Sequence, residues 1–134
     1  MMKNKIIDSI LNNCNVCLKP SKVCDGIGVF ALIDISEKTI LFSDIEPDID
    51  FIAWDNIEKI SIESKIYLKR MCNSNDAGLF LSRTVSAINL SYYVNHSDNF
   101  NVHHDLTLDR YVATKDIKAG EELLCKYVFS EIDF

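Results

Sequence analysis

The C-terminal third of the chain, residues 89–127, restricts the fold because short apolar runs alternate there with polar turns. Asn95-His96-Ser97 follows an amphipathic stretch, and Gly120-Glu121-Glu122-Leu123 opens a final run that ends near Tyr127. Short apolar runs bounded by turns are typical of β-strands. We expect strands at residues 101–104, 110–114 and 123–128. This pattern predicts a mostly β, α+β domain.

The remainder of the chain mixes short strands with helical patterns. Residues 5–13 predict a helix with Ile6, Ile7, Ile10 and Leu11 facing inward, and residues 85–94 predict a second helix. Near-helical spacing across residues 54–75 predicts one or two further helices. We expect strands at residues 16–19, 29–33, 39–42 and 79–82. A turn at residues 36–38 would join the strands at 29–33 and 39–42 as a hairpin.

Size and charge limit the classes of function. At 134 residues the chain is expected to be one domain, 1–134. Its net charge of −6 and the lack of a basic stripe argue against direct binding to nucleic acid and favour a basic partner. The acidic stretch 44–50 is either an attractive surface for a cationic peptide or an ordinary solvated loop. No membrane contact is expected, since no run approaches the length of a span.

The five cysteines predict reduced thiols and an intracellular location, in the cytoplasm or nucleus. Cys14, Cys17 and Cys24 include one Cys-x-x-Cys half-site, but Cys72 and Cys125 stand alone and no second half-site follows. We therefore expect no metal site, with a cysteine-based zinc module as the less favoured alternative.

Several short motifs gain meaning as a set. Gly26-Ile27-Gly28 before an apolar strand, the Asn95-His96 pair, Asn101 and the Gly-Glu-Glu-Leu segment followed by Tyr127 together resemble the SET-domain protein lysine methyltransferases. The resemblance implies a SET-domain fold of small β-sheets with short helices and a C-terminal pseudoknot. It implies a core at residues 15–43 and 84–128, with a variable insert at 44–83.

The resemblance also implies a function and a set of site residues. The expected reaction is methyl transfer from S-adenosyl-L-methionine to a lysine side-chain amine in a basic protein, a histone tail among the candidates. Tyr127 would be the catalytic residue. The residues expected to bind the cofactor are Gly26, Ile27, Gly28, Asn89, Tyr92, Asn95 and His96. Those expected along the substrate channel are Tyr93, His104, Cys125 and Phe129.

Departures from the family pattern keep an alternative open. Tyr92 stands where many members carry arginine, Cys125 stands where an aromatic often sets the number of methyl groups, and residues 98–100 lack the usual cysteine and proline. The compact length resembles the minimal single-domain SET proteins of large DNA viruses. The alternative is a non-catalytic SET-like module that binds a basic peptide. A homodimer is left open.

Overall fold

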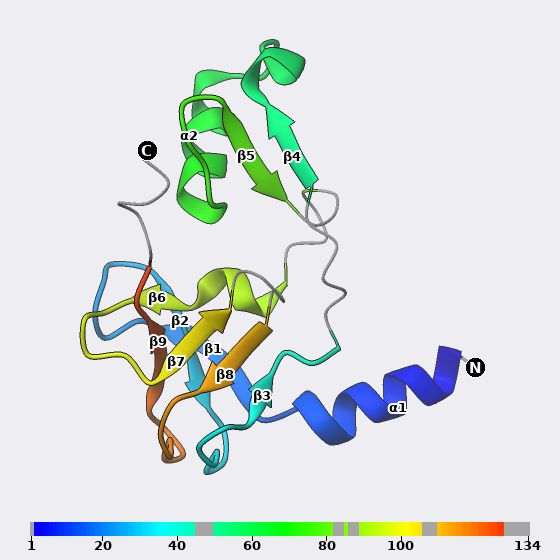
Figure 1. Cartoon of the computed structure of the whole chain (residues 1–134), viewed down its shortest axis with the longest axis vertical. Helices are drawn as coiled ribbons and strands as arrows, with labels where there is room; N and C mark the ends of the chain where they lie inside the picture. Colours follow the sequence, from blue (N-terminus) through cyan, green and yellow to red (C-terminus); the bar gives the residue numbers. More distant parts are fainter. Residues whose placement is uncertain (1, 45–49, 82–84, 86–88, 106–109, 128–134) are drawn as a thin grey trace. The chain divides into compact units, whose positions relative to one another are not determined.

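The computed structural model describes residues 2–44, 50–81, 85, 89–105 and 110–127, in two compact units (Figure 1). Unit 1 comprises Met1–Ile45 and Tyr93–Tyr127, and unit 2 comprises Glu46–Tyr92 and Val128–Phe134. Two predicted features, most of the acidic stretch and the channel residue Phe129, lie outside the described residues. The division into a core and an insert at 44–83 stays a prediction.

Unit 1 is built mainly of strands. Its elements are α1 (Met2–Asn13), β1 (Val16–Pro20), β2 (Ile27–Ala31), β3 (Ile40–Leu41), β6 (Asn95–His96), β7 (Val102–Asp105), β8 (Arg110–Ala113) and β9 (Glu122–Cys125). The strands form one sheet in the order β1-β2-β9-β7-β8-β3, and β6 pairs with β9 in addition. Strands are confirmed at the three predicted places: the first two match within a residue, and the third, predicted at 123–128, spans Glu122–Cys125 and so ends three residues earlier.

The core of unit 1 lies where β2, β7 and β9 meet. Val29, Val102 and Leu123, one from each strand, are completely buried. Burial of such apolar side chains contributes about 1.5–3 kcal/mol each, so these strands are the main source of stability in the unit. Phe30 and Ala31 are buried as well, which makes β2 apolar on both faces, as expected for a central strand.

Strand β9 runs beside the loop that follows β6 (Figure 1). It pairs in parallel with β6 through His96 and Cys125, and with β7 through Val102 and Cys125. Between these pairs, Ser97 donates its N–H to the Cys125 carbonyl at 3.0 Å. The C-terminal strand therefore lies beside the Asn-His segment, as the predicted C-terminal pseudoknot requires.

The predicted hairpin between residues 29–33 and 39–42 is wrong. Strand β2 pairs with β1 and β9, whereas β3 pairs with β8 through Ile40 and Val112. The cause lies in the turn at residues 36–38, where Lys38 has a positive φ of 73° and donates its N–H to the Ala113 carbonyl. This left-handed residue turns the chain toward β8 instead of back along β2.

Helix α1 forms as predicted, but its apolar residues do not face inward. Ile6, Ile7, Ile10 and Leu11 are between 43% and 76% exposed. The unit 1 core closes without them, and the helix contacts the unit through polar groups, including Asn13 with Ser43. In the part of the chain that the structure describes, no helix has the length and apolar character to cross a membrane.

In its described residues, unit 2 contains a two-stranded sheet, a 3-10 helix and an α-helix, together with most of the 3-10 turn η3 (Leu90–Tyr93). Its elements are β4 (Asp50–Ala53), the 3-10 helix η1 (Trp54–Ile57), α2 (Ile62–Met71) and β5 (Gly78–Leu81). Its core holds Trp54, Cys72 and Leu79. The helices predicted across residues 54–75 and the strand near 79–82 are confirmed, whereas β4 was not predicted.

The helix predicted at residues 85–94 differs in its described part. Leu90–Tyr93 is a single 3-10 turn, η3, and not an α-helix. The Asn89 side-chain oxygen accepts hydrogen bonds from the N–H and the hydroxyl of Ser91. Such a local bond from an asparagine side chain competes with α-helical pairing and favours a short turn.

Candidate active site

The site predicted from the sequence depends on two segments far apart in the chain, and the structure brings them together. Tyr127 donates its backbone N–H to Nδ1 of His96 at 2.9 Å, across a separation of 31 residues. Their rings lie 5.2 Å apart, centroid to centroid. Because Nδ1 accepts this bond, it carries no proton, and the other ring nitrogen, Nε2, lies 3.7 Å from the Asp98 carboxylate.

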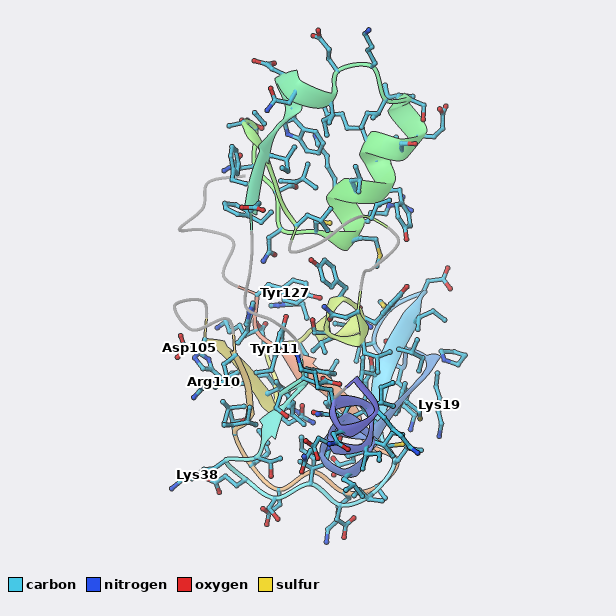
Figure 2. All side chains as sticks on the ribbon, turned by 90° about the vertical axis from the view of Figure 1, so that its right-hand side faces the viewer. Lys19, Lys38, Asp105, Arg110, Tyr111 and Tyr127 are labelled. Carbon is cyan, nitrogen blue, oxygen red and sulfur yellow. The ribbon has the colours of Figure 1, made fainter. Side chains whose placement is uncertain are left out.

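The Tyr127 hydroxyl is anchored to the chain just before β6. It donates a hydrogen bond to the backbone carbonyl of Val94, which is buried. Tyr127 as a whole is 36% exposed, so its ring lies partly open while its hydroxyl end is sheltered. Figure 2 shows Tyr127 and Lys38 at opposite ends of unit 1.

Burial keeps the Tyr127 hydroxyl protonated. Desolvation raises its pKa well above the usual value for a phenol, and the thiol groups of Cys125 and Cys24 raise it further. A phenol with a raised pKa is neutral throughout the physiological range. The site therefore holds an uncharged hydroxyl that can donate and accept hydrogen bonds.

This shift predicts a pH dependence. A pKa raised in the folded state contributes stability that is present below the unfolded value, about 10 for tyrosine, and is lost as pH rises above it. Subtracting the phenolate absorbance of Tyr127→Phe from that of the wild type isolates the signal of Tyr127. We expect this signal to appear at higher pH in the folded protein than in denaturant. Titration of both states at the same pH would contradict the assigned environment.

A second cluster forms where β6 meets the loop before β2. Asn95 donates from Nδ2 to the Ile27 carbonyl at 3.0 Å, which ties the predicted cofactor-binding Asn95 to the predicted Gly26-Ile27-Gly28 segment. A Cβ atom on Gly28 would lie 3.4 Å from that same Nδ2 and closer still to Glu122. Gly28 is thus required by the close approach of its neighbours, whereas a Cβ on Gly26 would meet only the Cys24 sulfur at 3.7 Å.

The predicted channel residues have different surroundings. Tyr93 is half-buried against the unit 1 core. Cys125 is 4% exposed within that core, and burial raises the pKa of its thiol to about 12, so the thiol is not a nucleophile at neutral pH. His104 stacks on Tyr111 of the neighbouring strand, with ring centroids 4.1 Å apart. The role of each in a channel stays a prediction.

Two predicted cofactor-binding residues, Asn89 and Tyr92, belong to unit 2. Asn89 caps the turn described above, and Tyr92 packs against the core of Trp54, Cys72 and Leu79. Their part in cofactor binding stays a prediction. Among the described residues, no group of three or more His, Cys, Asp or Glu side chains is placed to hold a metal ion.

Comparison with known proteins identifies the family. The family model of the SET domain matches residues 26–128 of the chain. The chain belongs to the SET-domain family. The predicted SET-domain fold is thereby confirmed, and members of the family are generally lysine methyltransferases that use S-adenosylmethionine. No curated protein matches the chain.

Solved structures support the fold. The crystal structure of polycomb repressive complex 2 from Chaetomium thermophilum is similar at a TM-score of 0.57 and 26% identity, over 86% of this chain and 15% of that chain. An autoinhibited form of that complex bound to S-adenosylmethionine is similar at a TM-score of 0.54 and 27% identity, over 84% of this chain and 15% of that chain. A Plasmodium falciparum structure named as a histone methyltransferase is similar at a TM-score of 0.53 and 20% identity, over 87% of this chain and 95% of that chain. At this identity the likeness shows the fold alone.

This chain covers only a small part of the Chaetomium proteins. In the humanized mutant of the complex bound to the inhibitor GSK126, it covers 14% of the matched chain. The activity and the partners of that complex belong to a much larger protein. What these comparisons show for this chain is the SET domain itself.

Proposed function

We propose that the protein transfers a methyl group from S-adenosyl-L-methionine to the side-chain amine of a lysine in a basic protein. The observation that carries this proposal is the contact of Tyr127 with His96 and Val94, because it places a neutral phenol beside the predicted cofactor-binding pair. The family supports the same chemistry.

The residues of unit 1 fit the proposed cofactor. The two hydrogen bonds that Asn95 donates from Nδ2 orient its amide, and the side-chain oxygen, to which the described residues donate no hydrogen bond, can accept one from a ligand. Asn95, His96 and the Gly26-Ile27-Gly28 segment would hold the cofactor. When bound, S-adenosylmethionine supplies an electrophilic methyl group on a positively charged sulfur.

The chain itself must deliver a neutral amine. A lysine in water has a pKa of about 10.4, so only about one in a thousand is neutral near pH 7. Desolvation between aromatic side chains lowers that value. The Tyr127 oxygen can accept a hydrogen bond from the amine while its own proton is held by Val94, and so orient the lone pair. The lysine ammonium releases its proton to solvent before the transfer, which leaves the neutral amine to attack the methyl group.

The substrate class follows from charge. With 20 acidic and 14 basic residues, the protein is drawn to cationic partners, which suits a lysine-rich tail such as that of a histone. We include in the proposal the minimal type similar to viral SET proteins, for which the support is the sequence after the Asn-His pair, residues 101–107.

The experiment is incubation with methyl-labelled S-adenosylmethionine and purified core histones, followed by hydrolysis and separation of methylated amino acids. We expect label in methyl-lysine, and none when histones lacking their tails are used. Cofactor binding by calorimetry without transfer to any basic protein would favour the alternative, a non-catalytic module for basic peptides. Failure to bind the cofactor would contradict both the activity and the cofactor assignment.

A further inference from the structure

Glu122, the first residue of β9, is a buried carboxylate that the proposed reaction does not use. It is 7% exposed and pairs across the sheet with Phe30. Within the described residues its carboxylate accepts hydrogen bonds from Ser21, Lys22 and Asn95, and it makes no ion pair with a lysine or arginine side chain. Burial of an unpaired carboxylate is costly unless donors compensate it, so these donors are part of the reason why the local structure is fixed.

The donors come from two separate segments. Ser21 donates its hydroxyl to Oε2 at 2.8 Å, and Lys22 donates its backbone N–H to Oε1 at 2.8 Å. Asn95 donates from Nδ2 to Oε2 at 3.2 Å. Hydrogen bonds to an ionised acceptor are about twice as strong as neutral ones. Glu122 therefore ties the loop before β2 to the side chain of Asn95.

Gly28 shares the same space. A Cβ on Gly28 would lie 2.3 Å from Oε2 of Glu122 and 2.9 Å from its Cδ. Both distances are below any normal contact, so the carboxylate occupies the volume that a side chain at position 28 would need. The glycine and the glutamate are therefore a matched pair, although 94 residues separate them, from 28 to 122.

Glu122 also fixes which way the Asn95 amide points. The amide nitrogen faces two acceptors, the Ile27 carbonyl and the Glu122 carboxylate, at 3.0 Å and 3.2 Å. The reversed amide would place oxygen against both acceptors and lose both bonds. Asn95 is therefore locked with its oxygen turned away from Glu122, where that oxygen presents an acceptor to a ligand.

We propose that Glu122 is the positioning residue of the cofactor site, which holds the Asn95 amide and the loop 21–28 in their binding arrangement. This inference rests on the proposed function, because it assigns Glu122 to the cofactor that Asn95 would bind. Glu122 acts through Asn95 and the loop, and its replacement should weaken cofactor binding more than it slows the chemical step.

The first test is Glu122→Gln, with Glu121→Gln as the matched control. A glutamine presents an N–H₂ group to at least one of the present donors and so loses at least one hydrogen bond. We expect the dissociation constant for S-adenosylmethionine to rise about 10-fold, as the loss of one charge-assisted bond implies, while kcat at saturating cofactor changes less than about threefold. The Glu121 side chain is exposed and, among the described residues, accepts the Lys118 N–H and contacts no part of the Asn95 cluster, so its replacement should leave both values unchanged.

The second test uses the matched pair. Gly28→Ala alone should raise the dissociation constant about 10-fold, because the new methyl displaces the carboxylate. In the Glu122→Ala background the same change should cost less than about twofold, since the space is then free. Equal effects of Gly28→Ala in both backgrounds would overturn the inference.

A measurement without cofactor separates this inference from the proposed function. Hydrogen exchange at the Lys22 amide should be about 10-fold faster in Glu122→Gln and unchanged in Glu121→Gln, because the Lys22 N–H loses its ionised acceptor. If the wild type binds S-adenosylmethionine and Glu122→Gln binds equally well, the inference alone is overturned. If the wild type does not bind it, the proposed function fails together with the inference, whatever the exchange rates show about the loop.

Discussion

Replacement of Tyr127 by phenylalanine is expected to lower the rate of methyl transfer by about 100-fold or more, the scale associated with loss of a group that handles a reacting proton or amine. The phenylalanine keeps the ring beside His96 but removes the hydroxyl that donates to Val94. The Val94 carbonyl is then left without that donor, which costs about 1 kcal/mol of stability. Cofactor affinity should change little, because Asn95 and Gly28 are untouched. Single-turnover rates and calorimetry measure the two effects separately.

The matched control for this variant is Tyr67→Phe. Tyr67 lies on α2 and is 50% exposed, so loss of its hydroxyl should leave the rate and the unfolding midpoint unchanged. Full methyl transfer in Tyr127→Phe would reject the catalytic role of Tyr127. Equal loss of rate in both variants would mean that the assay responds to the loss of any tyrosine hydroxyl.

Asn101→Ala is expected to lower the free energy of unfolding by about 2–4 kcal/mol, through the loss of two buried hydrogen bonds. Asn101 is 9% exposed and joins its loop to β9 with both ends of its amide. Nδ2 donates to the Glu122 carbonyl at 2.9 Å, and Oδ1 accepts the Leu124 N–H at 2.8 Å. Alanine leaves both main-chain groups without these partners in a closely packed part of unit 1. Urea unfolding followed by circular dichroism gives the change.

Asn99→Ala provides the comparison for that measurement. Asn99 lies in the same loop and is exposed, and its backbone N–H, not its side chain, donates to Ser97. We expect a change within about 0.5 kcal/mol, as is usual for an exposed side chain. A loss of stability in Asn101→Ala no larger than that in Asn99→Ala would show that the Asn101 bonds do not hold the loop on β9.

The sequence was sufficient to predict that His96 and Tyr127 meet, because the motif residues fall in an order that the SET-domain fold brings together. His96 and Tyr127 are 31 residues apart, and only the parallel pairing of β6 with β9 makes them neighbours. No periodicity in either segment encodes that pairing. It was accessible through the resemblance to a family, and not from local propensity.

Predictions from the local sequence pattern were wrong where contacts between distant parts of the chain determine the structure. The strands at residues 29–33 and 39–42 looked like a hairpin, but the positive φ of Lys38 directs the second strand to β8. The apolar spacing of α1 correctly predicted a helix and wrongly predicted burial, because the unit 1 core is filled by residues outside the helix. A helical period shows where an apolar face lies along the chain, and not whether another element covers it.

Glu122 was overlooked for a related reason. The Gly-Glu-Glu-Leu segment was noticed as a motif, but two adjacent glutamates look alike in sequence. Strand alternation separates them, since Glu122 is buried against Asn95 and Gly28 whereas Glu121 is exposed. A charged residue at the start of an otherwise apolar strand was the available signal.

The most direct test of the account is a titration of the protein with S-adenosylmethionine, followed through backbone amide resonances in nuclear magnetic resonance spectra. We predict saturable binding of one cofactor per chain, with the largest shifts at the Gly26-Ile27-Gly28 segment, at Asn95 and His96, and at Tyr127. Saturable binding with shifts confined to other residues, or no binding at all, would contradict the site described for this SET domain.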